Sequence, residues 1–151
     1  MTDAFSALDR LTITQACIDL IHRFALTNDA RDSDALAEMF VSDGIFRRPS
    51  APDVPYEGRE AIRAGFRARP ASLLTRHIVC NPTITVLSAT EARAESYILL
   101  YTATIEEGAK LPVPAAPKAL LGAFDDTIVR DTDGVWKFKD RKGSLAMTLG
   151  G

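Results

Sequence analysis

The spacing of hydrophobic residues changes along the chain, from three or four residues in the first part to two in the second part. The first spacing predicts amphipathic helices and the second predicts strands with one buried face. A long helix is expected around an apolar stripe that comprises Ile13, Cys17, Leu20, Ile21 and Phe24. Thr12 or Thr14 is expected to cap its start, and Gln15 can complete a capping box with Thr12. Two shorter helices are predicted at 34–40 and 59–69.

Four long strands are predicted in the second part, at 75–87, 91–105, 119–131 and 135–147. The turn "TDG" predicts a hairpin between the last two, and Pro82 predicts a bulge or a sheet edge in the first. A short strand is predicted at 44–49, a loop at 50–58, and a loop or flap at 106–119, which contains three prolines. Helices followed by strands in meander order predict an α+β domain with an antiparallel sheet. If this sheet curves strongly around the first helix, it encloses a pocket of the kind that binds small ligands.

Length and charge narrow the class of protein further. The 151 residues suit one domain, expected as a core at 11–142 after a flexible lead at 1–10. A net charge of -2 leaves no basic surplus for nucleic acid or a membrane surface. No apolar run reaches the roughly 20 residues of a membrane span, and no signal-peptide core is visible. Cys17 and Cys80 are expected to be buried, reduced thiols, which indicates a cytoplasmic protein.

Four segments in order, "NDARDSDALAEMF", "YEGREAIRAGF", "TRHIVCNPTI" and "GVWKF", carry a family resemblance. Together they resemble the SnoaL-like branch of the nuclear transport factor 2-like superfamily, over about 11–141. The resemblance implies a cone, in which a curved antiparallel or mixed sheet wraps around three N-terminal helices and encloses a pocket. Relatives include dehydratases, isomerases, dehydrochlorinases, cyclases and non-catalytic domains, and one fold that hosts many functions does not specify the reaction.

The resemblance also implies a site. Dehydratase-type members use an aspartate at the end of the first helix and a histidine on a central strand, and these positions match Asp29 and His77. An arginine after "WKF" recurs in dehydrochlorinase-like members, and Arg141 is similarly placed. Scytalone dehydratase, a related enzyme, has a second histidine and pocket tyrosines that have no counterpart here. That difference argues against the scytalone reaction itself and leaves an Asp-His pair.

The sequence pattern alone does not decide which way the Asp29 side chain points. A helical wheel of about 100° per residue puts Asn28 on the apolar stripe and Asp29 about 100° from its centre. Asp29 therefore reaches the pocket only if the helix bends or ends near residue 28; otherwise it is a surface residue beside Arg31. An acid near a helix C-terminus is poorly placed for the helix dipole, which favours a functional reason for Asp29. Asp32 and Asp34 are instead assigned to the start of the next helix.

For the histidines and arginines, the sequence pattern also distinguishes a role in the pocket from a structural or surface position. His22 falls away from the apolar stripe and is expected at the surface. His77 lies in an alternating strand, where a hydrogen-bonded core or sheet-surface histidine is the alternative to a pocket role. For Arg141, which has charged neighbours, a solvated strand edge is the alternative. Arg48 shares a strand face with Phe46 and is a candidate pocket cation.

We therefore expect a cofactor-independent lyase or isomerase that acts on a small, largely apolar molecule, either carbonyl-bearing or halogenated. His77 would remove a proton from an activated carbon, Asp29 would orient its ring, and Arg141 or Arg48 would hold an anion. The residues expected to contact the ligand are Phe24, Asn28, Phe46 and Arg48. The alternative is a ligand-binding or assembly domain of the same fold without chemistry. No metal motif, phosphate loop or nucleophile elbow is visible, and a homodimer or homotrimer is expected.

Overall fold

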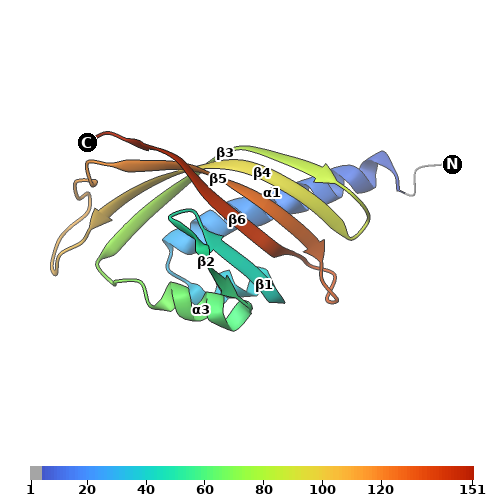
Figure 1. Cartoon of the computed structure of the whole chain (residues 1–151), viewed down its shortest axis with the longest axis horizontal. Helices are drawn as coiled ribbons and strands as arrows, with labels where there is room; N and C mark the ends of the chain where they lie inside the picture. Colours follow the sequence, from blue (N-terminus) through green and yellow to red (C-terminus); the bar gives the residue numbers. More distant parts are fainter. Residues whose placement is uncertain (1–4) are drawn as a thin grey trace.

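The computed structural model of the protein describes residues 5–151, which form three helices and one six-stranded sheet (Figure 1). The helices are α1 Ala7–Asp29, α2 Ser33–Glu38 and α3 Arg59–Arg67. The strands are β1 Phe40–Arg48, β2 Ala51–Glu57, β3 Leu73–Val86, β4 Glu91–Thr104, β5 Ala119–Arg130 and β6 Trp136–Leu149. This composition confirms the predicted α+β class.

The six strands form one open, mixed sheet in the order β2-β1-β6-β5-β4-β3. Strands β3 to β6 form the predicted antiparallel meander, and β1 joins the far side of β6 in parallel. Figure 1 shows these long strands arching over α1, with β1, β2 and α3 grouped around one end of that helix. The predicted cone, with a sheet wrapped around helices, is therefore confirmed.

Helix α1 begins earlier than the sequence pattern predicts. The Ser6 hydroxyl accepts a hydrogen bond from the Asp9 backbone N–H at 3.1 Å, and the Asp9 carboxylate accepts one from the Ser6 N–H at 2.8 Å. This reciprocal capping box satisfies backbone donors that the first turn would otherwise leave unpaired. The prediction that Thr12 or Thr14 caps the helix is wrong, because both lie inside it and the Thr12 hydroxyl donates to the Leu8 carbonyl.

The apolar stripe predicted for α1 is buried as a whole, and Ala25 and Asn28 extend it by one turn. Residues 7–10, expected as part of a flexible lead, belong to this helix, and residues 1–4 lie outside the described residues. Within residues 5–151, no helix is long and apolar enough to cross a membrane.

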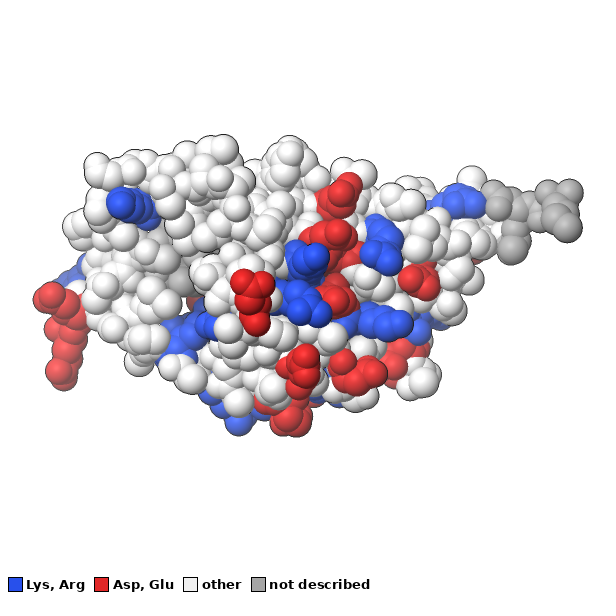
Figure 2. Space-filling view, in the orientation of Figure 1, with Lys and Arg blue, Asp and Glu red and all other residues white. Residues whose placement is uncertain are grey.

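Charged side chains join α2 to α3. The Asp32 carboxylate caps α2 by accepting from the Ala35 N–H, which confirms the structural assignment of Asp32. Asp34 lies in the first turn of α2, as predicted, and bonds Arg63 at 2.7 Å and Arg67 at 2.6 Å. Figure 2 shows charges of both signs mixed over the lower part of the molecule, around α3.

Two predictions about the segment between α2 and α3 are wrong. Phe40, expected in a helix, begins β1 and is fully buried opposite Phe138 of β6. The segment expected as a loop forms β2, although it contains Pro52 and Pro55. Proline removes a backbone donor and is tolerated on edge strands, and β2 is an edge strand that pairs only with β1. Burial and pairing therefore override the local signals here.

Strand β3 carries the predicted irregularity at Pro82. Its pairing with β4 shifts register between Cys80 and Thr83, and Asn81 has a φ of 54°. Because β3 is also the other edge of the sheet, both interpretations of Pro82 hold. Cys17 is buried as expected, whereas Cys80 is only half-buried.

Six phenylalanines form the centre of the core. Phe24 of α1 contacts the others, with ring centroids 5.7–6.4 Å apart. Its partners come from β1, α3, β5 and β6: Phe40, Phe46, Phe66, Phe124 and Phe138. This aromatic cluster supports one wall of the cavity described next.

Candidate active site

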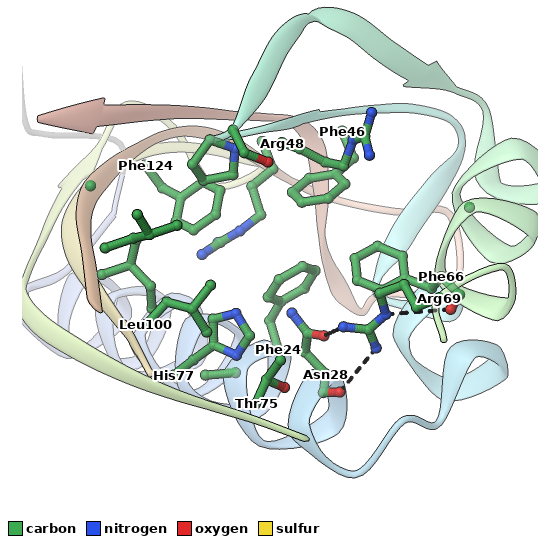
Figure 3. Close-up of a pocket in the computed structure, with 18 of the residues that line it drawn as sticks. Phe24, Asn28, Phe46, Arg48, Phe66, Arg69, Thr75, His77, Leu100 and Phe124 are labelled. Carbon is green, nitrogen blue, oxygen red and sulfur yellow. Dashed lines mark hydrogen bonds between the residues drawn. The ribbon is translucent and has the colours of Figure 1, made fainter. Parts of the chain in front are cut away.

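A cavity of about 250 Å³ lies between the concave face of the sheet, the C-terminal half of α1 and α3 (Figure 3). Most of its wall is apolar. The sequence-predicted residues that line it are Phe24, Asn28, Phe46, Arg48, His77 and Arg141. Asp29 stands behind His77 and does not itself line the cavity. The structure therefore brings the predicted residues together around one space.

His77 is held from behind by Asp29. One carboxylate oxygen, Oδ1, lies 2.6 Å from His77 Nδ1 and accepts a second hydrogen bond from the Thr75 hydroxyl at 2.8 Å. The other oxygen, Oδ2, accepts from the His77 backbone N–H at 2.8 Å. An ionised carboxylate can only accept, so Nδ1 of the imidazole carries the proton. In a neutral ring the basic atom is then Nε2.

Hydrogen bonds hold Asp29 in its charged form. Burial by itself would raise the pKa of Asp29, but the hydrogen bonds from His77 and Thr75 outweigh it, so the pKa lies below its usual range. The side chains of Asp29 and His77 are only 10% and 13% exposed. A fixed negative charge at this distance would stabilise a positive imidazolium as it forms.

The question of Asn28 or Asp29 is answered by the position of β3. Asn28 lies on the buried stripe, as the helical wheel predicts, and is 6% exposed. Helix α1 packs lengthwise against β3, so the side of the helix next to the stripe faces that strand. Asp29 is the last residue of α1 and uses this side to reach Thr75 and His77. Both residues contribute, in adjacent directions.

Arg69 fixes the orientation of the Asn28 amide. The guanidinium donates to Asn28 Oδ1 at 2.6 Å and to the Asn28 backbone carbonyl at 3.2 Å. A guanidinium cannot accept hydrogen bonds, so the amide oxygen must face Arg69. Figure 3 shows the Asn28 nitrogen turned the other way, toward the cavity. Arg69, which follows the end of α3, therefore lies against the site.

Arg141 is fully buried, which corrects the alternative of a solvated strand edge. Its Nη1 donates to Asp126 Oδ2 at 2.8 Å from the neighbouring strand. Its guanidinium also lies over the rings of Phe24, Phe124 and Phe138, with Cζ 3.9–4.5 Å from their centroids. Burial raises the pKa of Asp126 to about 7, although Arg141 acts in the opposite direction.

Three residues of the site were missed from the sequence. Thr75 lies two residues before His77, on the same face of an alternating strand, and this spacing could have revealed it. Asp126 alternates with the buried Phe124 and Ile128, which is a visible signal for a buried acid. Arg69 gave no signal, because its contact with Asn28 joins distant parts of the chain.

His22 is exposed, as predicted. Among residues 5–151, no group of three or more His, Cys, Asp or Glu side chains could hold a metal ion.

Comparison with known proteins identifies the family. Residues 9–142 match the SnoaL-like domain family, which is nearly the whole chain. The protein therefore belongs to the SnoaL-like family, as its sequence segments predicted. A search of curated proteins finds no match.

Solved structures share the fold over almost the full length. One is a protein of Novosphingobium aromaticivorans provisionally named scytalone dehydratase, with 26% identity, a TM-score of 0.81 and coverage of 97% of this chain and 92% of that chain. Another is hexachlorocyclohexane dehydrochlorinase LinA-type3 of Novosphingobium barchaimii LL02, with 21% identity, a TM-score of 0.77 and coverage of 97% and 94%. ActVI-ORFA of Streptomyces coelicolor has 23% identity, a TM-score of 0.69 and coverage of 89% and 97%. The last two likenesses show the fold alone.

Proposed function

We propose that this protein is a cofactor-independent lyase or isomerase in which His77 acts as a general base on a small, largely apolar substrate. The observation that carries the proposal is the 2.6 Å contact of Asp29 with His77 Nδ1, on a histidine that lines an apolar cavity. The names dehydratase and dehydrochlorinase among proteins of the same fold support this class of reaction. The required steps use only side chains of this chain.

The reaction begins with removal of a proton from carbon. His77 Nε2 takes a proton from a carbon next to a carbonyl group, or from one whose neighbour carries a leaving group. In an elimination, the C–H electron pair forms the double bond and the leaving group departs as an anion, or, when it is a hydroxyl group, it takes the proton back from the His77 imidazolium and departs as water. In an isomerisation, the proton returns at a different carbon. Asp29 stabilises the imidazolium in either case.

Two side chains are suited to the negative charge that develops. The Asn28 amide nitrogen faces the cavity, and no described residue accepts a hydrogen bond from it, so it can donate to a substrate oxygen. Arg141 lines the cavity and is fully buried, so its charge acts in a medium that screens it weakly. We assign Asn28 to a substrate carbonyl oxygen and Arg141 to the developing or departing anion.

Proton exchange tests the assignment of His77. Wild type and His77→Gln are incubated with 2-tetralone in D₂O, and deuterium uptake is followed by NMR. General base catalysis contributes about 10²–10⁴-fold, so uptake by His77→Gln should fall by that order. His22→Gln is the matched control, because His22 is the other histidine of the chain and is exposed.

Equal exchange rates for wild type and His77→Gln would remove the base assignment and leave a ligand-binding domain.

Asn28→Asp separates two roles of Asn28. The aspartate keeps an oxygen for Arg69 but replaces the cavity-facing donor by an acceptor. Exchange should therefore fall by at least about tenfold, as for other lost oxyanion donors.

We also propose that the outer face of the sheet joins two or more copies of the chain. Apolar residues lie opposite one another across four strands: Ile78, Leu99, Leu121 and Met147. On β3, β4 and β5, residues that line the cavity alternate with them. Ile78 is 48% and Met147 52% exposed. Figure 2 shows little charge over the C-terminal part of β6. Exposed apolar patches of this kind are typical of interfaces. Light scattering on Met147→Glu should show smaller particles than wild type.

A further inference from the structure

The cavity wall is positively charged, although the whole chain has a net charge of -2. Three arginines, Arg48, Arg69 and Arg141, are among the residues that line it, and no aspartate or glutamate of the described residues is. The two nearby carboxylates stand behind the wall. Asp29 is engaged by His77, and Asp126 by Arg141. A ligand in this cavity therefore meets more positive than negative charge.

Of these three arginines, Arg48 makes the fewest hydrogen bonds with its guanidinium group. Its Nε is buried and has no hydrogen-bond acceptor among residues 5–151. Its one described contact is with the Tyr56 ring, with Cζ 4.8 Å from the centroid. A buried donor without an acceptor is costly, and a guanidinium in such a place needs an anionic partner or ligand.

Arg48 and Arg141 lie on the neighbouring strands β1 and β6. Arg48 follows Phe46 by two residues on β1, and the pairing of β1 with β2 is irregular between them. Phe46 is opposite Arg141 on the neighbouring strand β6. All three are among the residues that line the cavity, with the Arg48 guanidinium over the Tyr56 ring and the Arg141 guanidinium over Phe24 and Phe124.

Arg69 adds to this positive field. Its hydrogen bonds go to neutral oxygens, two of Asn28 and one of Phe66, and not to a carboxylate. Burial and the neighbouring Arg31 lower the pKa of Arg69, and the charge of Asp29 opposes them in part. Arg31 and Arg69 therefore put two positive charges next to each other on this side of the site.

We propose that the cavity binds a monocarboxylic acid with an aromatic or alicyclic body, and that Arg48 holds the carboxylate. The proposal rests on the proposed function and names the substrate class of the same site. Nε and one Nη of a guanidinium form a fork that matches the two oxygens of a carboxylate. The rings of Phe24, Phe46 and Phe124 would pack against the apolar body. The reacting carbon would then lie toward His77.

Calorimetric titration with a matched pair of probes tests the charge preference. The probes are 2-naphthoate and 2-naphthamide, which have the same body and differ in charge. Wild type should bind the acid at least about tenfold more tightly than the amide, which corresponds to about 1.4 kcal/mol. Arg48→Met should remove this preference by weakening the acid and not the amide, whereas Arg48→Lys should keep part of it.

Arg47→Met is the matched control. Arg47 precedes Arg48 on β1, has its guanidinium 3.6 Å from the Asp140 carboxylate, and does not line the cavity. It should keep the full preference for the acid. Equal affinities of the two probes for wild type, no binding of the acid at millimolar concentration, or a preference that survives in Arg48→Met would each overturn the proposal.

His77→Gln separates this proposal from the proposed reaction. Because Arg48 and not His77 holds the carboxylate, His77→Gln should still prefer the acid. An acid preference without any proton exchange would leave a binding protein for carboxylic acids, so the ligand class would stand and the reaction would fail. Exchange that depends on His77, together with equal binding of acid and amide, would leave the reaction and refute the ligand class.

Discussion

Two carboxylates are buried beside basic side chains in this protein, and they are satisfied very differently. Asp29 accepts three hydrogen bonds, from the ring and backbone of His77 and from Thr75, at 2.6–2.8 Å. Asp126 accepts one, from Arg141 at 2.8 Å, and its other oxygen has no donor among residues 5–151. The pKa of Asp29 lies below its usual range, whereas that of Asp126 is raised to about 7.

Two differences account for the opposite pKa shifts: Asp126 is fully buried whereas Asp29 keeps some exposure, and Asp29 accepts more hydrogen bonds. Asp29 is at the end of a helix, where its side chain can reach both backbone and side-chain donors of β3. Asp126 is in the middle of a strand, where the residue opposite, Arg141, is its one donor in the described chain. Asp29 therefore stays negatively charged behind His77 at neutral pH, whereas Asp126 changes its charge near that pH.

The largest expected effect follows from removing the charge of Asp29. Asp29→Asn keeps the shape of the side chain but cannot stabilise an imidazolium, so deuterium exchange into 2-tetralone should fall by about 10²–10⁴-fold. Asp19→Asn is the control, since Asp19 is exposed on the same helix. If both variants exchange at the wild-type rate, the pair has no catalytic role.

Breaking the second pair should affect stability. Arg141→Met leaves Asp126 buried without its cation, and an unpaired buried charge costs about 3–5 kcal/mol. The loss should be large at pH 9 and small at pH 5, where Asp126 can take up a proton, and urea unfolding at both pH values measures it. The double variant Asp126→Leu/Arg141→Met should recover most of the loss at pH 9. A single variant as stable as the double at pH 9 would contradict this account.

The two carboxylates should also have opposite effects on the pH dependence of stability. Asp126 binds its proton more tightly in the folded chain, so the stability of wild type relative to Asp126→Asn should fall between about pH 4 and 7, by up to about 1.4 kcal/mol per pH unit. Asp29 has a lowered pKa, so its stabilisation is present above the usual carboxylate range and is lost as the pH falls through the lowered value. Denaturation of wild type, Asp126→Asn and Asp29→Asn between pH 3 and 8 gives the stability difference between wild type and each variant as a function of pH. Slopes of the same sign for the two variants would contradict this prediction.

The smallest expected effect concerns the third donor to Asp29. Thr75→Val removes one hydrogen bond of the carboxylate and should destabilise the protein by about 1 kcal/mol, with a modest loss of exchange. Thr85→Val, an exposed position on the same strand, should change stability by less than about 0.5 kcal/mol. A larger loss for Thr85→Val than for Thr75→Val would show that the hydroxyl of Thr75 does not matter.

Local patterns in the sequence were sufficient for several features. The stripe from Ile13 to Phe24, the exposure of His22 and the placement of Asp32 and Asp34 at the start of α2 all follow from helical periodicity and capping. The meander of long strands follows from alternation. These features depend on residues within one or two helical turns or within a single strand, so residues that are close in sequence are enough to predict them.

Other features needed the tertiary structure. The prolines of β2 predicted a loop, because the sequence does not state that this segment lies at a sheet edge. The charged neighbours of Arg141 in the sequence predicted that its side chain is exposed to solvent. Its burial depends on the packed phenylalanine rings and on Asp126, which the local sequence does not reveal. The role of Arg69 depends on a contact with Asn28, 41 residues away.

By itself, then, the sequence determined the α+β class, the family and the pairing of Asp29 with His77 through the family resemblance. Only the tertiary structure decided that Asn28 lines the cavity while Asp29 bonds Thr75 and His77, and that three arginines are among the residues lining that cavity. The physical reason is that periodicity reports which side of one element is apolar. The direction of a polar side chain, and the charge it meets, are decided by elements that lie far away in the chain and pack against it.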